Sequence, residues 1–334
     1  MRVTYIAALL FACPGLAGCA VSSRLEAADP QQSPVETTGS VARPVAAAPA
    51  AAAPAFSEER PTPVSMTTGT SYAPLPVSRP TQVAMNGAPA AIRRLAADAV
   101  EVHSRRFRDA KPINFGAASP RRLAVHGVDV SRWQGEIDWV KLRSQGANFA
   151  YIKATDGGDH LDPMFHRNWH AAEAAGLRRG AYHFFYWCRS ASEQAAWFIR
   201  NVPRVEGALP PVIDVEWNGE SRCTRRPSRE QVLEKMRVFM ERLEAHYGQR
   251  PIIYTAPDFY RDNLRGAFQD YPFWLRAVAQ HPSRVYPGRN WVFWQYSGSG
   301  LSHGVTGRID LNVFHGDENA WRTWLARSSR SARS

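Results

Sequence analysis

The sequence predicts an α/β fold: an irregular (β/α) barrel of the TIM-barrel type, with eight strands and fewer than eight helices. After residue 125, short apolar runs alternate with segments of helical periodicity, a pattern that favours parallel pairing of strands. Eight such runs occur. They fit within roughly 190 residues, whereas a complete barrel usually takes about 250. We therefore expect some helices to be missing near the C-terminus.

The extreme N-terminus has the features of a bacterial lipoprotein signal peptide, residues 1–18. Arg2 supplies a positive charge, and residues 6–11 form an apolar run. The run is far shorter than the roughly 20 residues of a membrane span. Leu16-Ala17-Gly18-Cys19 follows it and resembles a lipoprotein cleavage box. Cys19 is therefore the expected lipidation site, anchoring the protein in the cell envelope at the outer membrane, facing the periplasm. An ordinary signal peptide is the alternative.

Residues 19–120 are predicted to form a flexible tether ahead of one domain at residues 121–334. Eleven of the 24 prolines lie between Pro30 and Pro89, whereas all eleven tryptophans lie at or after Trp133. A segment rich in Ala, Pro, Ser and Thr cannot bury enough apolar surface to offset the entropy lost on ordering. A short helix from Ala91 to Arg106 is the one element expected in this tether.

Eight short apolar runs, bounded by turn signals, give the expected strands. Runs of this length with flanking Gly, Pro or polar residues are typical of strands whose two faces are both covered. They are residues 125–130, 149–154, 180–185, 211–216, 251–255, 273–278, 291–296 and 308–312.

Two of the intervening helices carry start and stop signals. Asp162, followed by proline, begins the first, and Gly176 ends it. Ser228 begins the second and forms a capping box with Gln231, and Gly248 ends that helix. Its apolar residues recur with a helical period and form one buried stripe: Val232, Met236, Phe239, Met240, Leu243 and Tyr247.

Two of the four cysteines predict a disulfide. Cys13 belongs to the signal and Cys19 to the lipid attachment, which leaves Cys188 and Cys223 as an even pair in an exported domain. Such pairs commonly form a bridge outside the reducing cytoplasm. Two separate buried thiols are the alternative.

Charge and motifs limit the expected partners. The formal net charge is +11, which suits an acidic polymer or an anionic membrane surface. No nucleic-acid-binding motif is present, so nucleic acid is not an expected partner, and we expect a monomer.

His166 and His170 are four residues apart, but no glutamate follows His166 as in a zinc-protease motif. No metal or cofactor is expected.

Polar residues stand at the ends of several predicted strands. Asp129 lies near the end of the first, Asp214 and Glu216 end the fourth, and Gln295 and Asp310 lie in the last two. The chemistry of barrel enzymes gathers at the C-terminal ends of the strands. Acids at the ends of apolar strands are costly unless they are paired or functional. These residues are therefore the candidate active site.

Asp214 and Glu216 give the most specific local signal. They are two residues apart on a strand, so their side chains point to the same face. Neighbouring carboxylates resist ionising together, and one of them keeps its proton to higher pH. A glycosidase needs one protonated acid for the leaving oxygen and one anion to support the developing positive charge. A surface pair or a helix cap is the alternative.

Aromatic side chains accompany these acids and could stack on the apolar faces of sugar rings. Core packing is the competing explanation for about half of such residues. The candidates that lie next to strand-end polar residues are Tyr182, Trp217, Tyr254 and Trp294.

Residues 126–135, His-Gly-Val-Asp-Val-Ser-Arg-Trp-Gln-Gly, resemble the opening motif of glycoside hydrolase family 25, the Chalaropsis-type lysozymes. The resemblance extends from about Val125 to Phe314. Further segments resemble the family's motifs in the same order along the chain: Tyr151–Thr155, Gly180–Phe184, Asp214–Glu216, Ile253–Thr255, Trp294–Ser297 and Ile309–Asn312.

The resemblance implies an N-acetylmuramidase that cleaves the β-1,4 bond after N-acetylmuramic acid in peptidoglycan strands, with retention. It implies that Glu216 is the general acid/base. It also implies that Asp214 stabilises an intermediate formed when the substrate's own 2-acetamido group attacks. Asp129 and Asp310 match the family's other two active-site acids, which bind or orient the substrate.

The chain departs from the family pattern at two positions. Many members have Glu where Asp156 stands, and many have Ala where Arg276 stands. Arg276 places a cation near the expected site, where it could meet a carboxylate of muramic acid or of the peptide stem, so Arg276 and Gln295 join the expected substrate-binding residues. Two other functions stay open: a non-catalytic peptidoglycan-binding barrel, and a glycosidase that acts on another N-acetylated glycan such as chitin.

Overall fold

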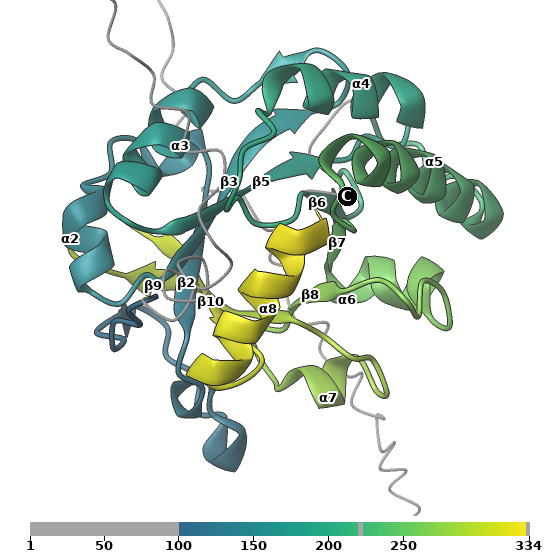
Figure 1. Ribbon diagram of the computed structural model, residues 1–334. Coiled ribbons are helices and arrows are strands. Elements are labelled where there is room, and N and C mark those ends of the chain that lie inside the picture. The colour runs from purple at the N-terminus through teal and green to yellow at the C-terminus, as the bar shows by residue number, and fades with distance from the viewer. Residues whose placement is uncertain (1–99, 220–222, 332–334) are drawn as a thin grey trace, which may run out of the picture. The chain divides into compact units, whose positions relative to one another are not determined.

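The computed structural model describes residues 100–219 and 223–331, and these form a closed β-barrel surrounded by helices (Figure 1). All eight predicted strands are present, displaced by a few residues at most. They are β2 (His126–Val130), β3 (Phe149–Asp156), β5 (Arg178–Phe184), β6 (Val212–Val215), β7 (Ile252–Thr255), β8 (Phe273–Arg276), β9 (Phe293–Leu301) and β10 (Ile309–Phe314).

The strand order around the barrel is β9-β10-β2-β3-β5-β6-β7-β8, and pairing of β8 with β9 closes it. Neighbouring strands are parallel except around β10, which runs antiparallel to both β9 and β2. The predicted irregular eight-stranded barrel is therefore confirmed. Two short strands pair with its members: β1 (Arg108–Asp109) with β9, and β4 (His160–Leu161) with β3.

The described residues contain seven α-helices, fewer than eight as predicted. The antiparallel β9–β10 connection needs no crossover helix, and this explains why a complete set is not required. The seven are α2 (Trp139–Ser144), α3 (Phe165–Ala174), α4 (Ala191–Asn201), α5 (Arg229–Tyr247), α6 (Pro257–Phe259), α7 (Pro282–Val285) and α8 (Glu318–Ser331).

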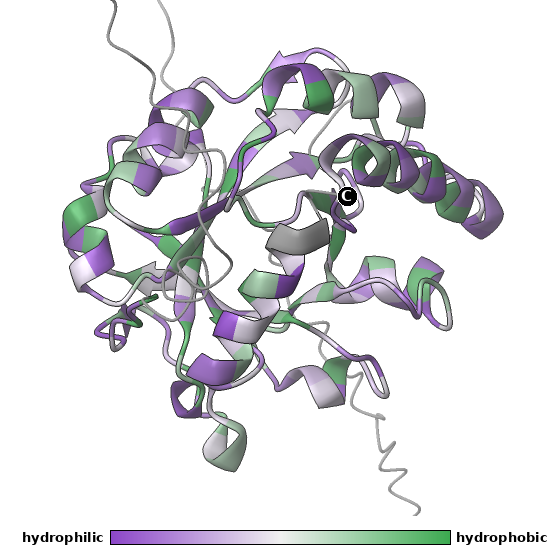
Figure 2. Cartoon of the chain, in the orientation of Figure 1, coloured by the Kyte–Doolittle hydropathy of each residue, from purple (hydrophilic) through white to green (hydrophobic). Residues whose placement is uncertain are grey.

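Helix α5 shows how the sequence sets an element. Ser228 and Gln231 form the predicted capping box, and Gly248 takes the left-handed conformation at φ 66° that ends the helix. The six residues of the predicted apolar stripe are the buried ones. Figure 2 shows the resulting pattern, with hydrophobic and hydrophilic residues alternating along the helix. Packing of this stripe fixes α5 against the barrel.

Helix α3 begins slightly later than predicted. Its first residue is Phe165, while the Asp162 carboxylate accepts a hydrogen bond from the Met164 amide at 2.9 Å. The second Asp162 oxygen accepts one from the Arg132 amide at 3.0 Å. Asp162 therefore ties the start of this helix to the segment that follows β2, in addition to ordering the turn before α3.

Apolar side chains form two layers, one inside the barrel and one between the barrel and its helices. The inner layer includes Phe149, Tyr151, Trp274 and Phe293 from the strands, together with Trp321 of α8. Trp321 packs against Phe149 with ring centroids 5.6 Å apart. Phe149 and Phe293 begin their strands, so α8 covers the N-terminal end of the barrel and leaves the other end to the polar residues.

Residues 100–120 pack against the barrel, ahead of the expected domain boundary at residue 121. Phe107 is buried, and β1 pairs with β9. The Arg143 guanidinium donates to the Glu101 carbonyl oxygen at 2.8 Å. Residues 100–106 are not helical, which corrects that part of the expected helix from Ala91 to Arg106. Residues 91–99, the signal segment and Cys19 lie outside the described residues.

The predicted disulfide is confirmed. Cys188 and Cys223 are bonded, with Cα atoms 5.5 Å apart. The bridge joins the segment after β5 to the segment after β6. None of the helices in the described part of the chain is long and apolar enough to span a membrane.

Candidate active site

The four acids predicted from the sequence lie together at the C-terminal end of the barrel. Asp129 and Asp310 face each other across the β2–β10 pair, and Asp214 stands beside Tyr254 in the β6–β7 pair. Glu216 and Asp129 each raise the pKa of Asp214 and of Asp310, which requires all four carboxyls to be near neighbours. Strand periodicity explains the convergence, because alternate residues of each strand point into the barrel.

Asp129 is a buried carboxyl held by two amide donors. It is 8 % exposed. One oxygen accepts hydrogen bonds from Gln295 Nε2 at 3.0 Å and from Asn312 Nδ2 at 2.6 Å. Burial raises the pKa of Asp129 to about 6, against the opposing effect of these two donors and of Arg276. The donors fix the orientation of the carboxyl, while its burial makes it a weaker acid than a free aspartate.

Two further hydrogen bonds set the orientation of those amides. The Tyr254 hydroxyl donates to Gln295 Oε1 at 2.9 Å, and the Trp274 indole donates to Asn312 Oδ1 at 2.8 Å. Each amide oxygen is thereby occupied, so each amide NH₂ is directed at Asp129. Gln295 and Tyr254 were predicted to bind sugar. Their side chains are 1 % and 4 % exposed, and in the structure they position Asp129.

Asp214 and Glu216 are the most deeply placed pair, at 7 % and 5 % exposed. Burial, and then the charge of Glu216, raise the pKa of Asp214 well above its ordinary value, while Lys153 acts in the opposite direction. Within the described residues, Asp214 Oδ1 is buried without a hydrogen-bond partner. The pair therefore holds a proton over a pH range in which an isolated aspartate has lost it, as an acid catalyst requires.

The backbone of Glu216 is fixed by Trp187. The Trp187 indole donates to the Glu216 carbonyl oxygen at 2.7 Å, and the Trp187 amide donates to Asn218 Oδ1 at 3.2 Å. Asn218 in turn donates to the Phe185 carbonyl oxygen at 3.1 Å. These bonds join the segments that leave β5 and β6, so the position of Glu216 depends on both.

Lys153 and Asn312 are inward-facing polar residues that were not predicted as site residues, although both lie in the quoted motifs. Lys153 pairs with Asp156 at 2.8 Å and lies 5.1 Å from the centre of the Phe184 ring. The signal that predicts them is the alternation of side chains along a strand, in which residues two positions apart point to the same face. Asn312 is two residues after Asp310, and Lys153 is two residues after the inward-facing Tyr151.

The predicted aromatic residues divide between the two faces of the barrel wall. Tyr182 is half-buried. Burial raises its pKa well above the ordinary value, and the charges of Asp129 and Asp214 act in the same direction, so it faces the acids. Trp217 and Trp294 pack in the outer layer instead. This placement corrects the prediction that those two tryptophans bind sugar.

The contacts of the two outer tryptophans explain why they are unavailable. Trp294 is 1 % exposed, and its indole donates to the Ala277 carbonyl oxygen at 2.8 Å. It follows Phe293 and precedes Gln295, both inward-facing, so strand alternation turns it outward. Trp217 donates to Asp262 at 2.9 Å, and the Arg226 guanidinium lies 4.8 Å from its ring centre.

Trp133 is the exposed aromatic residue close to the acids. It follows β2 in a short 3₁₀ turn, Arg132–Gln134, that Ser131 and Gln134 cap. Its side chain is 49 % exposed, and the Arg132 guanidinium lies 4.6 Å from the ring centre. An exposed aromatic ring of this kind is suited to stacking against the apolar face of a sugar.

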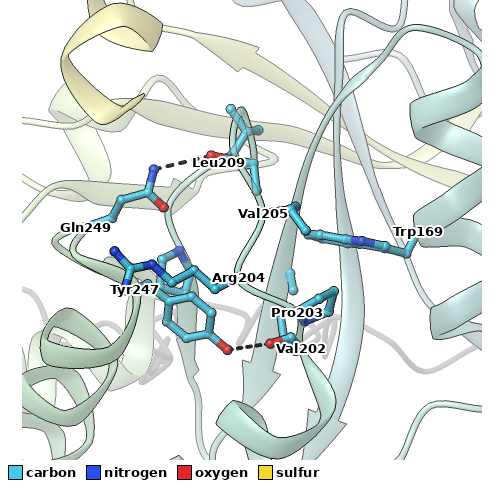
Figure 3. A pocket seen from close by; sticks show the side chains of 11 residues that line it. Trp169, Val202, Pro203, Arg204, Val205, Leu209, Tyr247 and Gln249 are labelled. Atoms are coloured by element: carbon cyan, nitrogen blue, oxygen red, sulfur yellow. Dashed lines mark hydrogen bonds between the residues drawn. The ribbon is translucent and has the colours of Figure 1, made fainter. Parts of the chain in front are cut away.

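A cavity elsewhere in the molecule has a different character (Figure 3). It is lined mostly by apolar groups from α3, from the segment between α4 and β6, and from the end of α5. Two of its polar groups are already engaged, since Tyr247 donates to the Val202 carbonyl at 2.9 Å and Gln249 to the Ala208 carbonyl at 3.3 Å. None of the four acids lines it. Among the described residues, no group of His, Cys, Asp and Glu has an arrangement suited to a metal ion.

Comparison with known proteins gives the family. Residues 128–305 match the model of glycosyl hydrolases family 25. The chain is 39 % identical over 221 residues to the uncharacterized protein YegX of Escherichia coli K12, covering 64 % of this chain and 78 % of YegX. It is 36 % identical to Lysozyme M1 of Streptomyces globisporus, over 58 % of this chain and 68 % of that protein.

Solved structures agree with the sequence comparison. The chain resembles a family 25 glycosyl hydrolase from Bacillus anthracis with a TM-score of 0.59 and 38 % identity, over 65 % of this chain and 98 % of that one. The family model covers the part of the barrel that carries Asp129, Asp214 and Glu216 and ends just before the strand that carries Asp310. The chain therefore belongs to family 25 of the glycosyl hydrolases and is a glycoside hydrolase.

Proposed function

We propose that this glycoside hydrolase is a lysozyme that cleaves the β-1,4 bond between N-acetylmuramic acid and N-acetylglucosamine in peptidoglycan, with net retention. The observation that carries the proposal is the meeting of Asp129, Asp214, Glu216 and Asp310 at one end of the barrel. The similarity to Lysozyme M1 of Streptomyces globisporus supports peptidoglycan as the substrate.

In the first step, Glu216 donates its proton to the glycosidic oxygen as the bond from that oxygen to C1 breaks. The carbonyl oxygen of the substrate's 2-acetamido group attacks C1 from the opposite side and forms a cyclic oxazolinium intermediate. Asp214 accepts a hydrogen bond from the acetamido N–H, whose positive charge grows as the ring closes. This bond gives the buried, unpartnered Oδ1 of Asp214 a donor and favours its ionised form.

In the second step, the Glu216 carboxylate takes a proton from a water molecule, and the oxygen of that water attacks C1. The oxazolinium ring opens, the acetamido group is restored, and Glu216 regains the proton it gave away. Two displacements at C1 leave its configuration unchanged. Asp129, Asp310 and the half-buried Tyr182 bind and orient the sugar during both steps.

The Glu216→Gln variant tests this assignment. We expect kcat on purified peptidoglycan to fall by roughly 10²- to 10⁴-fold, because the amide can neither donate an acidic proton nor accept one. Circular dichroism should show an unchanged fold. Glu241→Gln on the exposed face of α5 is a matched control with the same charge change and should keep full activity. Full activity of Glu216→Gln would exclude the acid/base role.

Mass analysis of the products separates the proposal from the two other functions. New reducing ends on N-acetylmuramic acid support a muramidase. Comparable cleavage of chitin oligosaccharides, which lack muramic acid, indicates a glycosidase for N-acetylated glycans in general. Binding of peptidoglycan by the active-site-intact protein without any turnover indicates a non-catalytic barrel.

We also propose that the enzyme works in the cell envelope, attached through lipid on Cys19 to the outer membrane and facing the periplasm. Because residues 100–120 pack on the barrel, the tether is about 80 residues long and, as a flexible coil, would have a reach on the order of 45–55 Å. Cys19→Ser should abolish incorporation of labelled fatty acid and shift the protein from the membrane fraction to the soluble fraction. Retention of both the label and the membrane association would contradict the anchor.

A further inference from the structure

Arg276 is a buried cation with no ion pair at the C-terminal end of the barrel. It is the last residue of β8, two positions after the inward-facing Trp274. Its side chain is largely buried, and within residues 100–219 and 223–331 it makes no hydrogen bond or ion pair. Nε itself is buried without a partner. The guanidinium offers five N–H donors, and none of them has an acceptor in the part of the chain that the structure describes.

The other inward-facing cation at this end has a different environment. Lys153 is paired with Asp156 at 2.8 Å. Arg276 acts only at longer range, where it lowers the pKa of Asp129 and of Asp310. Both acids nevertheless titrate above their ordinary range, so they supply an incomplete counter-charge. A buried charge is costly unless it is paired, which leaves Arg276 ready to take an anion.

We propose that Arg276 binds a free carboxylate on the muramic acid of the substrate and makes the enzyme prefer glycan strands that have lost their peptide there. The proposal rests on the muramidase function proposed above. A guanidinium binds a carboxylate through two parallel hydrogen bonds. The lactyl group of muramic acid offers such a carboxylate when it is unsubstituted, whereas an attached peptide turns it into a neutral amide. N-acetylglucosamine has no equivalent group.

Two substrates that differ only in this charge test the proposal. Glycan strands stripped of peptide by an amidase carry free carboxylates, and coupling them to methylamine gives neutral amides. We expect the wild-type kcat/KM to be higher on the free acid. Arg276→Met should lose about 10- to 100-fold on that substrate, mainly through KM, since it removes a charge-assisted pair. On the amide it should change little.

Further variants separate substrate binding from a structural or counter-ion role. Arg276→Lys should recover part of the preference, because it restores the charge without the paired geometry. Arg276→Gln replaces the methionine variant if the latter fails to fold. Arg284→Met removes an exposed charge on α7 and should leave both substrates unaffected. Equal losses on both substrates, or a wild type without preference, would overturn the proposal.

A binding measurement distinguishes failure of this inference from failure of the proposed function. Calorimetry with the Glu216→Gln protein should show tighter binding of the free-acid strands than of the amides, and Arg276→Met in that background should abolish the difference. If the wild type releases no reducing ends from any strand, the muramidase function fails. If the Glu216→Gln protein also binds free-acid and amide strands with equal affinity, the role proposed for Arg276 is excluded by that second result.

Discussion

At the residue scale, Asp129 shows how a buried acid of the candidate active site can lower the stability of the fold that carries it. Its carboxyl is buried, with two amide donors on one oxygen. Its pKa rises from the ordinary 3.8 to about 6. The native protein therefore keeps a proton at pH values where the unfolded chain has lost it. The contribution of this proton to the free energy of unfolding is greatest below pH 3.8, and it is lost as the pH rises through about 6.

Asp129→Asn should therefore stabilise the protein in a pH-dependent way. We expect a gain in the free energy of unfolding at pH 8 of up to roughly 3 kcal/mol, the value of two pKa units, and almost none near pH 3.5. Removing the charge also relieves Asp214 and Asp310, which acts in the same direction. Urea unfolding at the two pH values measures this. An equal change at both would contradict it, while activity should fall in either case.

At the scale of elements, the segments that follow β5 and β6 act as one unit. The Cys188–Cys223 bond, the Trp187 indole and the Asn218 amide all join them. The Trp187 indole also holds the Glu216 carbonyl, so we expect the bridge to stabilise the fold and to support the Asp214–Glu216 pair, to which we assign catalysis. Strand β6 alone is only four residues long, too short to fix the geometry beyond its own end.

Replacing both cysteines tests that unit. With a sequence separation of 35 residues, loop-closure entropy gives the bridge about 4 kcal/mol at most. We expect Cys188→Ser/Cys223→Ser to lose roughly 2–4 kcal/mol of unfolding free energy and part of its kcat. Wild type in dithiothreitol should behave in the same way, while the double variant should ignore the reductant. Unchanged unfolding of the variant would show that the other contacts suffice.

At the scale of the whole molecule, the two ends of the barrel have opposite chemistry. Helix α8 closes the N-terminal end with Trp321, which packs against Phe314 with ring centroids 5.1 Å apart. The polar cluster occupies the C-terminal end. The inner layer between the two ends contains Tyr254 and Trp274, whose polar groups bond the amides of Gln295 and Asn312.

Trp321 offers a matched pair of variants. Trp321→Ala should cost about 3–5 kcal/mol of unfolding free energy, because it leaves a large cavity in the inner layer. Trp321→Phe should cost roughly 1 kcal/mol or less, since it keeps most of the ring contacts and removes an indole N–H that is buried without a partner in the described residues. Denaturant unfolding measures both. Equal losses of unfolding free energy in the two variants would show that Trp321 does not stabilise the protein through the packing of its ring.

Features that depend on local pattern could be predicted from the amino-acid sequence. Apolar runs located all eight strands, and caps located α5 from Ser228 to Gly248. Acids at strand ends marked the candidate site, because β-strand alternation already places Asp214 and Glu216 on one face. The same alternation predicts that Trp294 points outward and Lys153 inward, as the structure shows.

Features that depend on register and on packing between distant segments became visible in the folded barrel. Register places Asp310 opposite Asp129 and brings Gln295 and Asn312 to the same oxygen. Packing places Trp217 in the outer layer and residues 100–120 on the barrel, and it leaves Arg276 without an ion pair among the described residues. Local patterns fix which face a side chain takes. Its neighbours on that face come from strands far apart in the chain, whose alignment is set by the closure of the whole barrel.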